Sequence, residues 1–545
     1  MNKEDTFVLI VGGGPVGLTA AIELGWRKLP AILVSENLKT AQHPKCNNTN
    51  ARSMEHFRRL GVARDIRAVG LPVQSARENA YVTRFCGYEL ARMTRPYPLM
   101  QQGRMSGGSA EFQKTPEPPH TISQIRLEPI LKQHAERAVD VRFGWRLLSF
   151  EQDAQGVTAL VESVTSGERR QIAARFMIAA DGAKSLVRRE LGIGMTGEDG
   201  TVERAFMGGT MLSYYIRAPA LMAQSGRAPA VITWIINREV RGFMYLQDGR
   251  ERWIVHFQVP KGVDAATLEP RAVVRSMIGA DTEFEILSGG PWTGGMALVA
   301  EQYRSGRIFL IGDAAHLFTP LGGFGMNTGI GDVMNLGWKL AAVHRGWAGT
   351  NLLDTFDSER RPIGARNSAL GVHCARKMSA WPVPEDIEAP GEAAETRRRA
   401  FGAFCVEDDK DQYNTTGLQL GERYEDSPIV CQDGTPPPPD VWSVYTPAER
   451  PGARLPHFWL ADGRSCYDLL GPNFTLVDFA QSDTAAFEAA AHARGMPLTV
   501  VRVAPPADVA FSPLVLVRPD QHIAWHGSAV PSGVAAVIDR VRGAL

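Results

Sequence analysis

The sequence has few cysteines, no excess of either charge and no long unbroken hydrophobic run. Its six cysteines are too far apart for any CxxC pair, which argues against a zinc site or a disulfide framework and favours a reducing, cytoplasmic compartment. The 59 basic and 59 acidic residues cancel, so we expect no general attraction to nucleic acid or acidic membranes. Several glycines, Pro15 and Glu23 interrupt the apolar segment Thr6–Gly25, so no membrane span is expected there.

Two further absences narrow the chemistry. The chain contains neither a GxSxG nor an HExxH motif, so it offers no sign of a serine nucleophile or a catalytic zinc. Its 545 residues, 44% apolar and 22% charged, are ordinary for a globular protein of two to four domains.

The N-terminal segment has the pattern of a parallel α/β unit. Phe7–Val11 is a short apolar run, as expected of a strand buried on both faces. Pro15–Leu24 is predicted as a helix and Ala31–Val34 as a second buried strand. This strand–helix–strand order predicts a parallel sheet that begins near residue 6.

The turn between the first strand and the helix fits GxGxxG over Gly12–Gly17. Gly12 permits the tight turn, Gly14 allows close approach of a pyrophosphate, and Gly17 allows the helix to pack on the strand. The phosphates are expected at the helix N-terminus, where free N–H groups and the dipole favour anions. Glu36, at the end of the second strand, is placed to accept hydrogen bonds from ribose hydroxyls. This motif alone predicts a dinucleotide and leaves FAD and NAD(P) open.

Two later motifs decide between these cofactors. Ile178–Arg188 contains Asp181-Gly182 after a strand, and Gly306–His316 is a strand that ends in Gly312-Asp313. The second motif continues through Pro320–Asn327 into a helix. Together with the N-terminal turn, these motifs resemble the single-component FAD-dependent aromatic hydroxylases, the group A flavoprotein monooxygenases. The resemblance covers about residues 6–370.

The resemblance implies roles for individual residues. Asp313 would hydrogen-bond a ribityl hydroxyl of FAD, and Asp181 is associated with the pyrophosphate and with use of NAD(P)H. Backbone N–H groups of Gly322–Asn327 would face the N1 and O2 edge of the flavin, beside Pro320. The predicted cofactor-binding residues are Gly12, Gly14, Pro15, Val16, Gly17, Glu36, Lys45, Arg52, Gln124, Asp181, Asp313, Pro320, Gly323, Gly325, Met326 and Asn327.

Four of the matching positions are less certain or depart from the family. Arg52 and Gln124 match family residues near the cofactor, although either could be an ordinary surface helix residue. Lys45 stands where many relatives have arginine, which keeps the charge but loses the bidentate fork. Asn47 stands where some phenol hydroxylases have a histidine, so substrate deprotonation by that route is in doubt.

The implied fold is α/β, like that of p-hydroxybenzoate hydroxylase. It has a Rossmann-like FAD-binding domain, an inserted β-sheet substrate domain and a thioredoxin-like C-terminal domain. The FAD-binding domain is expected at 1–72, 115–190 and 292–380, the substrate domain at 73–114 and 191–291, a helical and loop connector at 381–449, and the C-terminal domain at 450–545. Residues 71–121 look irregular, and the chain is expected to be helical after Pro362. The C-terminal domain has only Cys466, so it lacks a CxxC dithiol, and its role is expected to be structural or in oligomer contact.

The resemblance implies hydride transfer from NADPH or NADH to FAD, formation of a C4a-hydroperoxyflavin with O₂, and hydroxylation of a phenolic or other electron-rich aromatic small molecule. Epoxidation, Baeyer–Villiger-type or antibiotic-modifying oxygenation, or a flavin-bound scaffold without turnover, remain open. So does a homodimer. The substrate is expected between the flavin and the middle sheet, near Asn47, Pro320, Trp234 and Tyr245, where the last two could equally be core residues.

Overall fold

The computed structural model describes residues 3–45, 47–72, 77–101, 104–197, 210–292, 296–506 and 510–545. Its first layer is a sheet in which β9 (Asp140–Phe143), β2 (Ala31–Ser35), β1 (Lys3–Val11), β12 (Arg169–Ala179) and β21 (Ile308–Leu310) run parallel in that order. Val8, Leu9 and Ile10 of β1 are fully buried. The strand is therefore covered on both faces, as its continuous apolar run predicts. α1 (Pro15–Trp26) and α4 (Gln124–Ala138) pack together, and α1 also contacts α8 (Phe324–His344).

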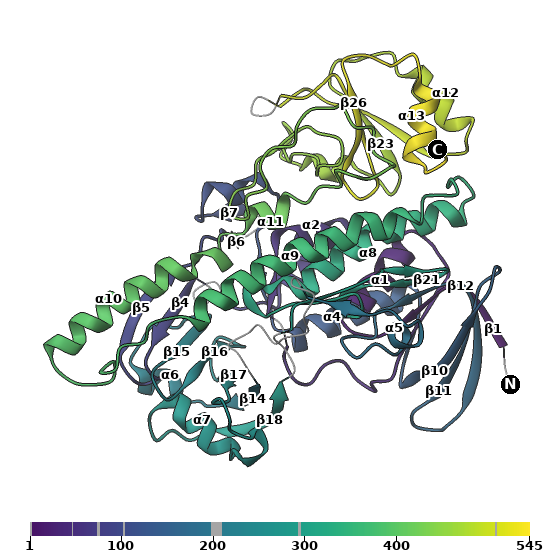
Figure 1. The fold of residues 1–545 in the computed structure, drawn as a ribbon. Helices are drawn as coiled ribbons and strands as arrows, with labels where there is room; N and C mark the ends of the chain where they lie inside the picture. The colour runs from purple at the N-terminus through teal and green to yellow at the C-terminus, as the bar shows by residue number, and fades with distance from the viewer. Residues whose placement is uncertain are drawn as a thin grey trace.

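An antiparallel extension widens this sheet. β10 (Trp145–Gln152) pairs with β11 (Val157–Ser163), which pairs with β12. These strands form the projecting β-meander near the N-terminus in Figure 1.

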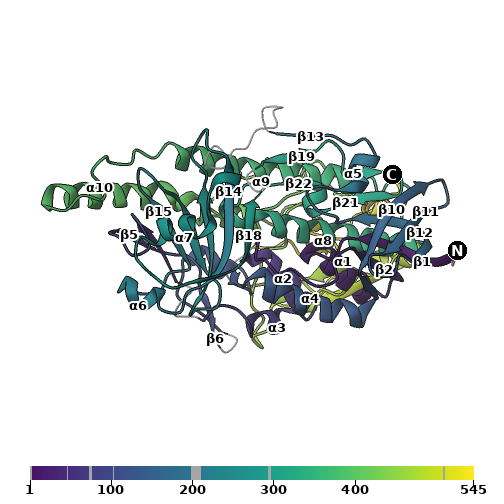
Figure 2. The ribbon, with the colours of Figure 1, turned by 90° about the horizontal axis from the view of Figure 1, so that it is seen from below.

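A second sheet of seven strands forms the other side of the molecule (Figures 1 and 2). Its order is β18 (Glu285–Trp292), β14 (Met211–Arg217), β17 (Arg252–Gln258), β16 (Arg241–Leu246), β15 (Ile232–Ile236), β4 (Glu78–Val82) and β5 (Glu89–Thr94). The sequence-based description of residues 71–121 as irregular is wrong for β4 and β5. Their pattern is obscured because β5 is an edge strand that carries charged residues on its open face.

Two long helices lie between the sheets and the C-terminal domain (Figure 1). They are α8 and α9 (Thr355–Ser379), which contact each other. α9 begins before Pro362 and continues through it, whereas the sequence predicted a helical stretch after that proline. Glu359 and Arg360, just before the proline, are buried in ion pairs that hold this part of the helix. α10 (Glu392–Asp409) packs on β5.

The C-terminal domain contains the sheet β24 (Leu498–Arg502), β23 (Phe474–Asp478), β25 (Leu514–Val517) and β26 (Ile523–Gly527), with α12 (Ala485–His492) and α13 (Val534–Val541). β23 and β24 are parallel and the other pairs antiparallel, which confirms the thioredoxin-like arrangement. Shorter elements include α2 (Ala51–Arg59), α5 (Leu186–Glu190), α11 (Thr416–Leu420), β3 (Asn48–Thr49), β8 (His120–Thr121), β20 (Arg304–Ser305) and β22 (His316–Leu317).

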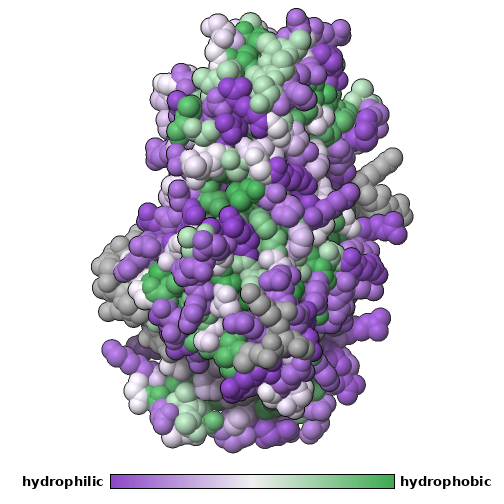
Figure 3. All heavy atoms as spheres, turned by 90° about the vertical axis from the view of Figure 1, so that its right-hand side faces the viewer, coloured by the Kyte–Doolittle hydropathy of each residue, from purple (hydrophilic) through white to green (hydrophobic). Residues whose placement is uncertain are grey.

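The molecular surface agrees with this layered packing. On the face shown in Figure 3, hydrophilic side chains cover most of the area and the hydrophobic areas are small and separated. No helix in the described part of the chain is both long and apolar enough to cross a bilayer.

Candidate functional site

The GxGxxG turn has the geometry that its glycines predict. Gly12 has a φ of 119°, and a Cβ there would lie 2.1 Å from the carbonyl oxygen of Ala180. A Cβ at Gly17 would lie 2.0 Å from the carbonyl oxygen of Gly12. By contrast, no heavy atom outside its immediate chain neighbours lies within 4 Å of a Cβ at Gly14, which caps α1. The turn is therefore closed where it packs and open where a phosphate would approach.

Two carboxylates flank this turn. Glu36 is exposed directly after β2 and has no ion-pair partner among the described residues. Asp181 follows β12, and its Oδ2 accepts a hydrogen bond of 3.2 Å from the Val187 backbone N–H at the start of α5. The Oδ1 atom of Asp181 is buried without a partner in the described part of the chain. Both carboxylates retain acceptor capacity for a ligand beside the turn.

Asp313 faces an accessible space deep in the same domain. Its side chain is exposed and forms no hydrogen bond with any described residue, yet burial among surrounding protein atoms raises its pKa. Accessibility combined with a raised pKa is the behaviour expected of a group that lines a recess. A Cβ on Gly325 would lie 4.0 Å from Asp313 Oδ1, so the carboxylate and the start of α8 border one space.

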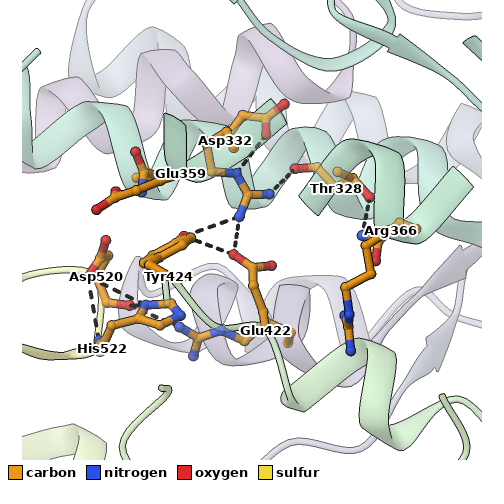
Figure 4. Close-up of polar contacts among 12 residues, drawn as sticks. Thr328, Asp332, Glu359, Arg366, Glu422, Tyr424, Asp520 and His522 are labelled. Carbon is orange, nitrogen blue, oxygen red and sulfur yellow. Dashed lines mark hydrogen bonds and ion pairs between the residues drawn. The ribbon is translucent and has the colours of Figure 1, made fainter. Parts of the chain in front are cut away.

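Asp332 of α8 holds the segment that carries Asp313. Its Oδ2 accepts hydrogen bonds from the Gly312 backbone N–H at 3.1 Å and from His316 Nε2 at 2.8 Å. Its Oδ1 accepts from Arg360 Nε at 2.9 Å, as Figure 4 shows. Although burial opposes ionisation, His316 and Arg360 lower the pKa of Asp332. His316 is therefore a structural partner of Asp332, and Asp332 is a positioning residue that sequence reasoning missed.

The glycine-rich turn before α8 adopts the backbone conformation that only glycine accepts readily. Gly322 and Gly323 have φ values of 75° and 69°. A Cβ at Gly325 would meet no atom closer than 3.7 Å, so this turn presents its backbone to open space. The first N–H groups of α8 have no partner within the helix, which makes them available donors. Met326, in the same turn of the helix, is partly accessible, as is Pro320 just before the glycines.

Asn327 has a different task from its neighbours in that turn. Its Oδ1 accepts from the Asn50 backbone N–H at 2.9 Å, and its Nδ2 donates to the carbonyl oxygens of Asn48 and Gly323. The side chain thus ties the turn to β3, and only the backbone of Asn327 remains for the predicted cofactor contact.

The loop with Lys45 meets the start of α4. The Lys45 backbone N–H donates to Gln124 Oε1 at 3.2 Å, and Gln124 Nε2 donates to Glu128 at 2.6 Å. Close by, Asn47 Nδ2 and Asn48 Oδ1 are buried without partners among the described residues. The structure therefore brings Lys45, Asn47 and Gln124 together and leaves unfilled hydrogen-bonding capacity beside the glycine-rich turn.

Arg52 points elsewhere. Its guanidinium donates to Glu55 at 2.8 Å, to Gln521 Oε1 at 2.6 Å and to the Asp520 carbonyl oxygen at 2.9 Å. These contacts join α2 to the C-terminal domain. The predicted contact of Arg52 with the cofactor is not supported by this placement and stays a prediction.

Further buried ion pairs attach the C-terminal domain to the helices below it. Arg518 donates to both oxygens of Glu359, at 2.6 and 2.8 Å, and Lys339 donates to the same carboxylate at 2.7 Å. Arg360 also contacts Glu422 and the Tyr424 hydroxyl (Figure 4). Removal of one member of a pair would leave the other as a buried charge without its partner, so we expect such a change to destabilise this interface strongly.

One face of the seven-stranded sheet looks towards the glycine-rich turn. Trp234 is 2% exposed and packs in one apolar cluster with Phe243 and with Leu321 and Phe324 of the turn. Its Nε1 donates to the Tyr413 hydroxyl at 3.4 Å. Tyr245 lies on the same face and keeps accessible surface, although burial raises its pKa. Trp234 is therefore a packed residue, while Tyr245 faces a recess.

Two histidines, His43 and His256, lie on this side of the sheet, and the sequence contained no indication of a functional role for either. Burial, with a smaller effect of His43, lowers the pKa of His256 to about 3, so it is neutral at physiological pH. His43 lies between the hydroxyls of Ser213 and Ser288, at 2.9 Å from each. Burial and then Lys45 lower its pKa as well. A lone histidine in a loop gives no sequence signal for such a contact with distant strands.

Known proteins resemble this chain over nearly its whole length. Residues 5–369 match the FAD binding domain family, and residues 448–544 match the aromatic-ring hydroxylase C-terminal family. The 4-methyl-5-nitrocatechol 5-monooxygenase of a Burkholderia species is 32% identical over 99% of this chain and 97% of that protein. The tetracenomycin B2 monooxygenase-dioxygenase of Streptomyces olivaceus is 32% identical, over 99% and 98% respectively. The structure of the rebeccamycin biosynthetic enzyme RebC with reduced flavin covers all of both chains at 34% identity and a TM-score of 0.90.

Proposed function

This chain belongs to the FAD-dependent aromatic-ring hydroxylases, and from that premise we propose that it hydroxylates a phenolic or other electron-rich aromatic small molecule. O₂ supplies the new hydroxyl oxygen, and NADPH or NADH supplies two electrons that reduce the second oxygen atom to water. We further propose that it acts in the cytoplasm, on the ground that its widely spaced cysteines suit a reducing compartment.

The observation that carries the proposal is the recess bordered by three parts of the chain. Asp313 supplies an unpaired acceptor, the N-terminus of α8 supplies donors, and the sheet face supplies an apolar surface. A cofactor with a polar chain at one end and a planar ring at the other fits a recess that has polar groups on one side and an apolar surface on the other. The open side of Gly14 suits its phosphates, and the partnerless atoms of Asp181, Asn47 and Asn48 suit its remaining polar groups.

When bound and reduced, FAD would activate O₂ as the C4a-hydroperoxide, so the task of the protein is positioning and exclusion of water. Asp313 would orient the ribityl chain as an acceptor, held by the Asp332 hydrogen bonds to Gly312 and His316. Backbone N–H groups at the start of α8 would stabilise negative charge on the ring edge that they face. Leu321 and Phe324 would keep water from the reacting face.

The chain places no ready base in the described part of this recess. Asn47 cannot accept a proton from a phenol, and His256 is buried and neutral with a pKa of about 3. Burial and Lys45 lower the pKa of His43, and both of its ring nitrogens lie 2.9 Å from serine hydroxyls, so it is a weak base with both nitrogens already engaged. We therefore expect oxygenation to depend on the ionisation of the substrate in solution more than on an enzyme group.

The test begins with purified protein and added FAD. NADH and NADPH oxidation is followed against a panel of phenols, with product and H₂O₂ both measured. The proposal predicts that one compound stimulates oxidation and yields one hydroxylated product per NAD(P)H consumed. Stimulation that yields only H₂O₂ would contradict hydroxylation, and an oxygenated product of another type would favour epoxidation or Baeyer–Villiger chemistry instead.

A further inference from the structure

A row of side chains crosses four neighbouring strands at one side of the seven-stranded sheet. Tyr245 of β16 pairs with Ile232 of β15, which pairs with Asn79 of β4. Asn79 in turn pairs with Met93 of β5. Arg95 comes two residues after Met93, and its backbone N–H continues the ladder to the chain before β4. Since paired residues and residues two apart share a face, Arg95, Asn79 and Tyr245 all lie on the face that looks towards the flavin turn.

Asn79 is fully buried with no hydrogen bond on either its Oδ1 or its Nδ2 atom among the described residues. An amide in that state carries the full cost of its lost hydration. Because the great majority of buried polar groups in proteins are paired, an amide with both ends unpaired indicates a partner that the chain itself does not supply.

Arg95, on the neighbouring strand, is a buried cation without a counter-ion. Its side chain is 7% exposed and forms no ion pair with a carboxylate in the described part of the chain. One terminal nitrogen donates to Thr121 Oγ1 at 3.2 Å, and the guanidinium lies 4.5 Å from the ring centroid of Tyr97. Its Nε atom is buried without a partner. By contrast, Arg52, Arg360 and Arg518, which are also buried, each pair with a carboxylate.

Other groups near Arg95 leave its charge uncompensated. Asp409 of α10 accepts hydrogen bonds from Tyr81 and Gln412, and burial raises its pKa to about 7. Its negative charge at neutral pH is therefore weaker than that of an ordinary carboxylate. Tyr245 and Tyr97 keep some accessible surface although burial raises their pKa values, so neither carries a negative charge near Arg95 at neutral pH.

We propose that Arg95 and Asn79, beside Tyr245, form an anion-recognition subsite that binds a carboxylate carried by the aromatic substrate. Arginine matches a planar carboxylate with two parallel N–H donors, and the Asn79 amide adds a further donor from the next strand. The substrate would fill the hydrogen-bonding capacity that both side chains lack in the free protein. This inference rests on the proposed function, because it assigns the acidic end of the molecule that the flavin oxygenates.

The first test compares binding of matched acids and amides to the FAD-loaded protein. The probes are 3- and 4-hydroxybenzoate and 1-hydroxy-2-naphthoate, each against the corresponding neutral carboxamide, with the change in flavin absorbance as the readout. We expect at least one acid to bind about tenfold or more tightly than its amide in the wild type. Arg95→Met should abolish this preference, and Arg95→Lys should restore part of it. Equal binding of every acid and amide, or no binding of any probe, would overturn the proposal.

Arg92→Met is the matched control. Arg92 lies on the same β5 strand but points to the other face, where it pairs with Glu78 and Glu89. This variant should keep the acid preference of the wild type. If it lost the preference as Arg95→Met does, the effect would be one of net charge and the assignment of Arg95 would be wrong.

A second test needs no ligand. If Arg95 and Asn79 are unpaired in the free protein for the sake of binding, Arg95→Met and Asn79→Leu should have a Tm equal to or above that of the wild type. A Tm several degrees lower in both variants would show that the side chains support the fold and would refute the subsite. These readouts are separate from turnover, so a protein that binds acids without hydroxylating them would refute only the proposed function.

Discussion

Replacement of Glu55 by glutamine should weaken the attachment of the C-terminal domain more than any surface ion-pair change. Glu55 of α2 is 1% exposed and accepts hydrogen bonds from Arg454, Arg52 and the Thr115 hydroxyl. Burial opposes ionisation, but the two arginines outweigh it and lower the pKa from 4.5 to about 2. At about 1.4 kcal/mol per pKa unit, the charged form gains about 3 kcal/mol from folding. Glu55→Gln removes this contribution and leaves two arginines buried without their counter-charge.

Amide hydrogen exchange of α2 and of residues 450–456 measures the local opening free energy directly, without requiring the whole chain to unfold in one step. A loss of about 3 kcal/mol predicts exchange faster by about 100-fold in Glu55→Gln. The control Glu395→Gln removes an exposed pair with Arg399 on α10 and should change exchange less than about threefold. Because the folded pKa of Glu55 is lowered, its contribution is complete above about pH 4.5 and is lost as the pH falls towards 2. Equal exchange in both variants at pH 7 would refute the reasoning.

Two other changes test the local geometry. Gly17→Ala would place a Cβ 2.0 Å from the Gly12 carbonyl oxygen. We therefore expect the variant to lose FAD binding or to fail to fold, as measured by flavin retention and circular dichroism. Normal flavin content in the variant would contradict this geometry of the turn. His526, bonded to Glu449 and Asp433, has a raised pKa, so its stabilising contribution is present below its unfolded pKa of about 6.5 and is lost as the pH rises through the folded value. His526→Gln should therefore reduce Tm at pH 6 more than at pH 9, and an equal reduction at both would count against this pairing.

Local sequence patterns predicted the parts of this protein whose partners are close in the chain or repeat in a known motif. The GxGxxG turn, the strand before Asp313 and the glycine-rich turn into α8 each depend on short-range geometry, and their backbone follows that prediction. The presence of an FAD-binding region followed by a separate C-terminal region was expected from the resemblance to a family, and the two family matches agree with it.

Contacts between distant segments were beyond the reach of such patterns. Arg52 sits in a motif that suggests a cofactor, yet two of its hydrogen-bond partners, Gln521 and Asp520, lie more than 460 residues away in the C-terminal domain. The importance of Asp332 appears only when α8 packs beside the Gly312–His316 segment. Likewise, β4 joins the sheet by pairing with the distant strand β15, and β5 joins it by pairing with β4, which brings Arg95 close to Asn79.

The most direct test of the central claim is the FAD affinity of the protein and of Asp313→Ala, measured by quenching of flavin fluorescence on titration of the apoprotein. The account predicts that the wild type binds FAD and that Asp313→Ala binds it about tenfold or more weakly, because a charge-assisted hydrogen bond is lost. Asp354→Ala, which removes an exposed aspartate paired with Arg304, should bind FAD as the wild type does. A wild-type protein that fails to bind FAD, or an Asp313→Ala variant with unchanged affinity, would contradict the account.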